Sequence, residues 1–215
     1  MSILTGPRAP ARSGTTKSLV ILLHGYGADG NDLFGLAGAL APHMPDTAFR
    51  SPNAPERCAV NPGGYQWFPI SWLDGSPESE MKAGAARAFD TLQAYLDEAM
   101  AEEGVGPEQV ALVGFSQGTM LGLQVAPRRK APFAGMVGFS GRHIPMEAPV
   151  TSPLPVLLVH GDMDEMVPVE AIHEARAALA AQGVPVEWHV SRGIGHGIAP
   201  DGLRLALDFL RRVLS

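Results

Sequence analysis

The stretch from Val110 to Gly122, VALVGFSQGTMLG, constrains the fold more than any other part of the chain. Its first four residues are apolar, as in a buried strand, and the residues after Gly118 suit a helix. Gly114 and Gly118 leave room between the two for a sharp turn that lifts Ser116 clear of the sheet. A glycine-rich turn with a serine is common by itself, but this strand-turn-helix context predicts a serine nucleophile.

Buried strands alternate with helical patterns along the rest of the sequence. Strands are expected at residues 19–23, 47–50, 133–139, 156–160 and 186–190, and helices at 33–40, 81–99, 171–179 and 203–214. Residues 1–18 are expected to form an extended edge segment or a short strand, and Asn31 or Asp32 is expected to cap the first helix. The alternation predicts an α/β fold, a mostly parallel central sheet with helices on both faces. We find neither a repeat nor a linker, so residues 1–215 are expected to form a single domain.

Composition argues against several kinds of partner. The chain has 16 Lys and Arg against 22 Asp and Glu, a net charge of -6, which disfavours nucleic acid and anionic membrane surfaces. The one cysteine, Cys58, cannot form an internal disulfide, and no Cys/His cluster has zinc spacing, so we expect neither metal nor cofactor. The N-terminal stretch resembles neither a signal peptide nor a membrane anchor. A cytoplasmic protein without integral membrane association is the default expectation, and a homodimer stays open.

Three loops that follow strands carry side chains suited to nucleophilic catalysis. A serine hydroxyl needs a base at neutral pH, and His196, set between glycines before the last helix, is the candidate. Asp162 and Asp164 could each orient that imidazole. We prefer Asp164, because it lies further along the loop and Asp162 is placed to bond turn backbone, but the residues alone leave both open. The chain order of serine, acid and histidine is that of the α/β-hydrolase architecture.

Two backbone N–H groups are expected to form an oxyanion hole. One belongs to Gln117, directly after the nucleophile, and the other to Tyr26 in the glycine-rich loop after the first buried strand. Each donor is worth roughly 3 kcal/mol in the transition state. The aromatic-rich segment 56–77 has no periodic element, and we expect its side chains, together with Tyr26, to wall an apolar acyl slot. The expected wall residues are Tyr26, Trp67, Phe68 and Trp72. The alternative is that these rings fill an edge of the core.

Five segments, LLHGYGADG, SPNAP, GFSQG, VHGDMDEMVP and GIGHG, occur in this order along nearly the whole chain. Together they resemble the phospholipase/carboxylesterase family, which includes bacterial carboxylesterases and acyl-protein thioesterases. The resemblance implies a minimal α/β hydrolase with no separate cap domain that cleaves carboxylic esters or thioesters. It implies Ser116 as nucleophile, Asp164 as acid and His196 as base, with Tyr26 and Gln117 as oxyanion donors. Several relatives carry Leu in place of Tyr26, and others carry Asp in place of Pro69, which leaves substrate choice open.

We therefore expect a serine carboxylesterase that hydrolyses short- to medium-chain esters, small molecules or acyl chains, through an acyl-enzyme. Lysophospholipids and S-acylated proteins stay open as substrates if the aromatic segment forms a surface groove. The alternatives are an acyl-protein thioesterase, a peptidase, a lactone-opening hydrolase, and a non-catalytic ligand-binding protein with this fold. Serine at position 116 disfavours a lactone hydrolase of the dienelactone type, which would carry cysteine, and the presence of all three residues disfavours the binding protein.

Overall fold

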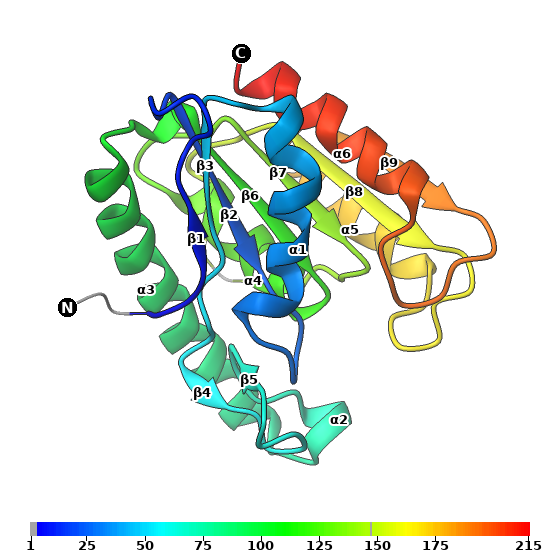
Figure 1. Cartoon of the computed structure of the whole chain (residues 1–215). Coiled ribbons are helices and arrows are strands. Elements are labelled where there is room, and N and C mark those ends of the chain that lie inside the picture. The colour runs from blue at the N-terminus through cyan, green and yellow to red at the C-terminus, as the bar shows by residue number, and fades with distance from the viewer. Residues whose placement is uncertain (1–3, 147) are drawn as a thin grey trace.

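The computed structural model describes residues 4–146 and 148–215, and its centre is a seven-stranded sheet (Figure 1). The strand order is β1-β3-β2-β6-β7-β8-β9, and every neighbouring pair is parallel except β1 with β3. The strands are β1 (Arg8–Ala9), β2 (Ser18–Leu23), β3 (Thr47–Arg50), β6 (Val110–Phe115), β7 (Gly135–Phe139), β8 (Val156–Gly161) and β9 (Val186–Ser191). The predicted mostly parallel sheet is confirmed, and the predicted N-terminal edge strand is the two-residue β1.

Helices cover both faces of the sheet, as the alternating pattern predicts (Figure 1). Helices α1 and α6 pack on one face, and α3, α4 and α5 pack on the other. Their bounds are α1 (Gly30–Leu40), α3 (Glu78–Glu103), α4 (Gln117–Val125), α5 (Glu170–Ala180) and α6 (Pro200–Val213). Short 3-10 turns lie at Ala41–His43, Pro107–Gln109 and Ala126–Arg128. None of the helices in the described part of the chain combines the length and the hydrophobicity that a membrane-spanning helix needs.

Successive residues of the central strands face opposite layers of helices. In β2, Leu19 and Ile21 belong to the core under α3, α4 and α5, whereas Val20 and Leu22 belong to the core under α1 and α6. All four side chains are completely buried. A strand covered on both faces needs apolar residues at every position, which is why these strands appear in the sequence as continuous apolar runs.

The cap of α1 differs from the expectation that Asn31 or Asp32 would cap it. The N-cap residue is Asp29, whose Oδ1 accepts hydrogen bonds from the backbone N–H groups of Asn31 and Asp32 at 2.8 and 3.1 Å. Three acidic or amide residues within four positions all suit a cap, and the backbone decides among them. Only Asp29 has the extended conformation that an N-cap requires.

The segment between β3 and α3 is mostly irregular, as expected, but it holds three short elements. Strands β4 (Glu56–Arg57) and β5 (Tyr65–Gln66) form a two-stranded antiparallel sheet, and α2 (Ser71–Asp74) is a single helical turn. Figure 1 shows this segment at the same end of the molecule as the loops that follow the parallel strands. The segment therefore flanks the edge at which the predicted site residues lie.

Candidate active site

Ser116 lies in a strained turn between β6 and α4. Its φ of 51° and ψ of -114° lie in a region that non-glycine residues rarely adopt. A Cβ at Gly118 would overlap the main-chain oxygen of Leu23, and one at Gly114 would lie 2.5 Å from the Thr119 nitrogen. Both glycines are therefore required for the helix to approach the sheet this closely, and the predicted strand-turn-helix context of Ser116 is confirmed.

Asp164 and His196 are brought together by the loops that follow β8 and β9. The Nδ1–H of His196 donates to Oδ2 of Asp164 at 2.8 Å, because a carboxylate oxygen in this pair can only accept. The Asp164 side chain is completely buried, whereas the His196 side chain is 22% exposed. With its hydrogen on Nδ1, the neutral imidazole has Nε2 free to accept a proton.

The Asp164 carboxylate is held in place by its own loop. Its Oδ1 accepts the backbone N–H groups of Met166 and Val167 at 3.0 and 2.9 Å. Burial opposes ionisation, but the hydrogen bonds from Val167, His196 and Met166 outweigh it and hold the pKa of Asp164 below its usual value. His160 lies alongside, with Nε2 donating to the Val167 carbonyl at 2.8 Å.

The structure separates the two candidate carboxylates that the residues alone left open. Oδ1 of Asp162 accepts the backbone N–H of Gly193 at 2.6 Å, so this side chain ties the loop after β8 to the loop after β9. Asp164, not Asp162, contacts the imidazole of His196. The expected backbone role of Asp162 is thus observed, although its partner lies on the neighbouring loop.

Ser116 and His196 line one cleft at the carboxyl edge of the sheet, with a cavity volume of about 170 Å³. The Phe115 ring packs beside the imidazole, with 4.9 Å between ring centroids. Most of the other lining side chains are apolar. They include Tyr26, Ile70, Trp72, Leu73, Met120 and Met166.

The four side chains expected to wall the acyl slot fall into two groups. Tyr26 and Trp72 line the cleft. Trp67 and Phe68 are completely buried and are not among the lining residues, so for these two rings the alternative interpretation, filling the core, fits their placement. Trp67 donates its indole N–H to the His24 carbonyl oxygen at 3.0 Å. These rings support the loops beneath the cleft.

The two loops expected to supply oxyanion donors are fixed from below. The Gln117 side chain accepts the Trp67 backbone N–H at 3.0 Å and donates to the Phe68 carbonyl at 2.7 Å, which fastens the start of α4. The buried imidazole of His24 donates from Nδ1 to the Gly25 carbonyl at 2.8 Å and accepts the Ala54 N–H on Nε2 at 3.0 Å. Burial lowers the pKa of His24, so this imidazole stays neutral and braces the Tyr26 loop.

Several residues of the site were missed by sequence reasoning. Leu73, Met120 and Met166 line the cleft but carry no chemical signature. Asp74 accepts a hydrogen bond from the Tyr26 hydroxyl at 2.9 Å. The signal for Asp74 was local, an acidic residue directly before Gly75 at the end of a short turn, but its partner is 48 positions away.

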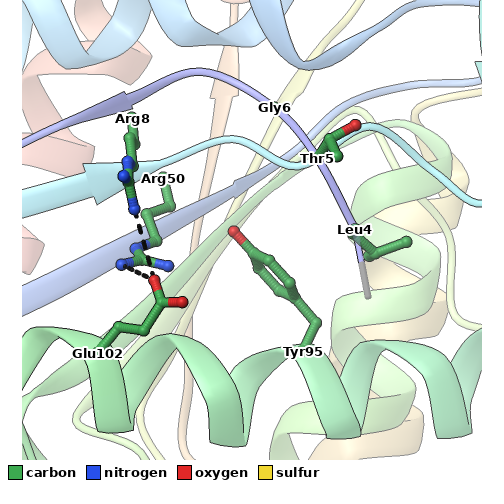
Figure 2. Close-up of a pocket in the computed structure, with 7 residues that line it drawn as sticks. All are labelled: Leu4, Thr5, Gly6, Arg8, Arg50, Tyr95 and Glu102. Carbon is green, nitrogen blue, oxygen red and sulfur yellow. Dashed lines mark hydrogen bonds and ion pairs between the residues drawn. The ribbon is translucent and has the colours of Figure 1, made fainter. Parts of the chain in front are cut away.

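A larger cavity, about 260 Å³, lies beneath the N-terminal segment and contains none of the predicted site residues (Figure 2). Its charged groups neutralise one another. Nη2 of Arg50 lies 2.7 Å from a Glu102 oxygen and 2.6 Å from a Glu103 oxygen, and Arg8 also reaches Glu102 at 3.5 Å. These ion pairs fasten β1 and β3 to the C-terminal end of α3. Within residues 4–146 and 148–215, no cluster of His, Cys, Asp or Glu could hold a metal ion.

The parallel sheet, the strained serine after β6 and the Asp–His pair on the loops after β8 and β9 define an α/β hydrolase. No separate cap domain stands over the cleft in the part of the chain that the structure describes. The model of the phospholipase/carboxylesterase family matches residues 7–214, and the chain belongs to this family. It is therefore a carboxylic ester hydrolase, and the resemblance read from the five motifs is confirmed.

Known proteins similar to this chain carry esterase and thioesterase names. Esterase YpfH of Escherichia coli is 26% identical over 97% of this chain and 86% of its own length. Acyl-protein thioesterase 1 of Gibberella zeae is 30% identical over 95% of this chain and 94% of its own length. The crystal structure of esterase PE8 superimposes with a TM-score of 0.92 at 45% identity, covering 98% of this chain and 99% of that protein.

Proposed function

We propose that this protein is a serine carboxylesterase in which Ser116 is the nucleophile, His196 the general base and Asp164 the residue that orients the imidazole. The observation that carries the proposal is the bond from His196 Nδ1 to the buried Asp164 carboxylate at 2.8 Å, in a cleft that Ser116 also lines. This bond fixes the tautomer in which Nε2 can take the serine proton.

The proposed reaction proceeds in two stages. Oγ of Ser116 attacks the ester carbonyl carbon as His196 Nε2 takes the hydroxyl proton, and the backbone N–H groups of Tyr26 and Gln117 bind the oxyanion that forms. Collapse expels the alcohol, which receives the proton from His196, and leaves an acyl group on Ser116. Water then attacks the acyl-enzyme with His196 again as base, which releases the acid and restores the serine.

The size and lining of the cleft favour esters with short or medium acyl chains as substrates. Its volume of about 170 Å³ is smaller than the roughly 300–1,000 Å³ that is typical of sites for drug-sized ligands. The wall formed by Tyr26, Trp72 and Leu73 offers apolar surface for an acyl chain, with Trp72 and Leu73 extending to the protein exterior. Lysophospholipid or S-acyl substrates would have to use this open side.

The direct test is hydrolysis of p-nitrophenyl esters by the wild-type protein and by Ser116→Ala, across a series of acyl chains. We expect turnover to be greatest for short and medium chains and to be abolished in Ser116→Ala while the thermal unfolding transition persists. Turnover that is unchanged in Ser116→Ala would overturn the nucleophile assignment.

The similarity to an acyl-protein thioesterase favours thioester hydrolysis as the second candidate activity. Oxygen esters and thioesters both form a tetrahedral oxyanion at the carbonyl carbon and differ only in the leaving group. The side chains named above therefore do not discriminate between them. Oxygen esters and thioesters with the same acyl chain, compared by kcat/KM, separate the two. A kcat/KM for thioesters that exceeds the value for matched oxygen esters by more than the difference in their intrinsic reactivity would favour the thioesterase.

A flat profile of ester turnover from pH 5 to pH 8 would argue against an imidazole base. We expect turnover to fall toward the acidic end of this range, because a general base must be unprotonated to accept the serine proton.

A cytoplasmic location and a single domain over residues 1–215 stay predictions from the sequence. Size-exclusion chromatography with light scattering tests whether the protein is a homodimer.

A further inference from the structure

One carboxylate, that of Asp74, connects two separate walls of the cleft. Its Oδ2 accepts the Tyr26 hydroxyl at 2.9 Å and the Ile70 backbone N–H at 2.8 Å, and its Oδ1 accepts the Ser76 backbone N–H at 2.9 Å. Tyr26 belongs to the loop after β2, whereas Ile70 and Ser76 flank α2. The side chain thus ties the predicted oxyanion loop to both ends of the α2 turn.

Outside the Asp74 contacts, the α2 turn is held by its own backbone hydrogen bonds, by the buried side chain of Ile70 at its start, and by the Arg142 guanidinium 5.3 Å from the Trp72 ring centroid. It consists of four residues, and a single helical turn is marginal without tertiary support. Trp72 is 49% exposed and Leu73 is 41% exposed, yet both line the cleft. Because these two side chains are only partly buried, their burial stabilises the α2 conformation little. We therefore expect the hydrogen bonds to Asp74 to contribute much of its stability.

Charge strengthens these contacts. Burial opposes ionisation of Asp74, but hydrogen bonds from Ser76, Ile70 and Tyr26 outweigh it and keep the pKa of this carboxyl below its usual value. Burial and the bond to Asp74 raise the pKa of the Tyr26 phenol, so the hydroxyl keeps its proton and remains a donor. Hydrogen bonds to an ionised acceptor are stronger than neutral ones.

We propose that Asp74 is a positioning residue for the acyl slot: through the Tyr26 hydroxyl and the α2 backbone it holds the slot wall in register with Ser116, and so sets the acyl-chain preference. The inference deepens the proposed esterase function and rests on it. A short acyl group makes little use of the wall, whereas a longer chain must lie along Trp72 and Leu73. Loosening the wall should therefore weaken binding of longer chains selectively.

The first test measures kcat and KM for p-nitrophenyl acetate and octanoate in the wild-type protein, Asp74→Ala and Asp90→Ala. The last is a matched control, because Asp90 is an exposed carboxylate on α3. In Asp74→Ala the ratio of kcat/KM for octanoate to that for acetate should fall about tenfold, mainly through a higher KM for octanoate. The control should keep the wild-type ratio. Equal losses for both esters, or an unchanged ratio, would overturn the proposal.

A double-mutant cycle tests whether Tyr26 and Asp74 act through their mutual bond. Tyr26→Phe keeps the ring and removes the hydroxyl, so it should lower the same ratio of kcat/KM values. In the double variant this ratio should be no lower than in Asp74→Ala. Asp74→Asn keeps an oxygen that can accept the Tyr26 hydroxyl and the Ile70 N–H, but it removes the charge and turns an NH₂ toward the Ser76 N–H, so its ratio should lie between those of Asp74→Ala and the wild-type protein. Strictly additive effects of the two single changes would mean that the residues act independently. That result would refute the brace, by which we mean the contacts of Asp74 with Tyr26, Ile70 and Ser76.

Hydrogen exchange separates a failure of this inference from a failure of the proposed function. Backbone amides of residues 70–76 should exchange faster in Asp74→Ala and in Tyr26→Phe than in the wild-type protein, whereas amides of β6 should not change. If the wild-type protein hydrolyses no ester, the proposed function fails, and exchange still decides whether the brace exists. Unchanged exchange over residues 70–76 in both variants would refute the brace even in an active esterase.

Discussion

Replacing Asp164 by Asn tests how the imidazole is prepared for catalysis. The substitution keeps the shape of the side chain, and the amide oxygen can still accept the backbone N–H groups of Met166 and Val167, as Oδ1 does now. The amide NH₂ then faces Nδ1 of His196, the position that Oδ2 occupies at 2.8 Å. A donor in this place favours the tautomer with hydrogen on Nε2, which cannot take the serine proton.

The magnitude follows from the burial of the pair. When His196 becomes positively charged during attack, a carboxylate about 4 Å from the charge centre stabilises it by about 4 kcal/mol at an effective dielectric constant near 20. At 1.36 kcal/mol per factor of ten, losing this attraction lowers kcat about a thousandfold. The unfavourable tautomer adds to this, and the equivalent change in a serine protease costs roughly ten-thousandfold. We therefore expect a loss of kcat between about a thousandfold and ten-thousandfold.

The assay is steady-state hydrolysis of p-nitrophenyl butyrate, with thermal unfolding as the check on folding. Asp162→Asn is the matched control, because it makes the same chemical change in the same loop and the amide oxygen can still accept the Gly193 N–H. It should lose less than about tenfold in kcat. A loss below about tenfold in a folded Asp164→Asn would refute the assigned role of this carboxylate.

Three further predictions concern the supporting structure. The folded pKa of His24 lies below the unfolded value of about 6.5, so the unfolded state binds more protons and the free energy of unfolding should fall as the pH drops below about 6.5. The free energy of unfolding, measured by urea titration, should depend less steeply on pH in His24→Asn than in the wild-type protein. An equally steep dependence in both would contradict the coupling between His24 protonation and folding. Arg50→Met removes the ion-pair partner of Glu103 and should lower the free energy of unfolding by roughly 2–3 kcal/mol in urea titrations. An unchanged free energy of unfolding would show that the ion pair contributes nothing to stability. Asp201 bonds His189 at 2.8 Å and Ser191 at 3.0 Å across the base of the His196 loop, so Asp201→Ala should lower kcat severalfold with little change in KM; an unchanged kcat counts against this positioning.

The features that the sequence predicted well are those set by short-range geometry. The turn at Ser116 follows from two glycines at fixed spacing, because a Cβ at Gly114 would lie 2.5 Å from the Thr119 backbone nitrogen in the helix that follows. The apolar runs of β2 and β6 indicate burial on both faces, and the alternation of such strands with helices predicted the parallel sheet. Such patterns depend only on neighbours in the chain.

The features that the sequence could not resolve depend on partners far apart in the chain. Asp162 and Asp164 differ only in which distant group each meets, Gly193 in one case and His196 in the other. His189 bonds Asp201 at 2.8 Å, and the residues next to His189 in the chain give no sign of this partner.

The aromatic segment shows the same limit. Trp67 and Trp72 lie five positions apart without periodicity, and only the fold buries one and leaves the other in the cleft. An aromatic side chain in an irregular segment carries no local signal for which way it will face.

The convergence of the three loops on one nucleophile is tested most directly by labelling with a fluorophosphonate, which reacts with an activated serine hydroxyl. Tandem mass spectrometry of the labelled protein should find one adduct, on the peptide that contains Ser116, and His196→Ala should slow its formation strongly. An adduct on another serine, or equal labelling of the wild-type protein and His196→Ala, would contradict the account.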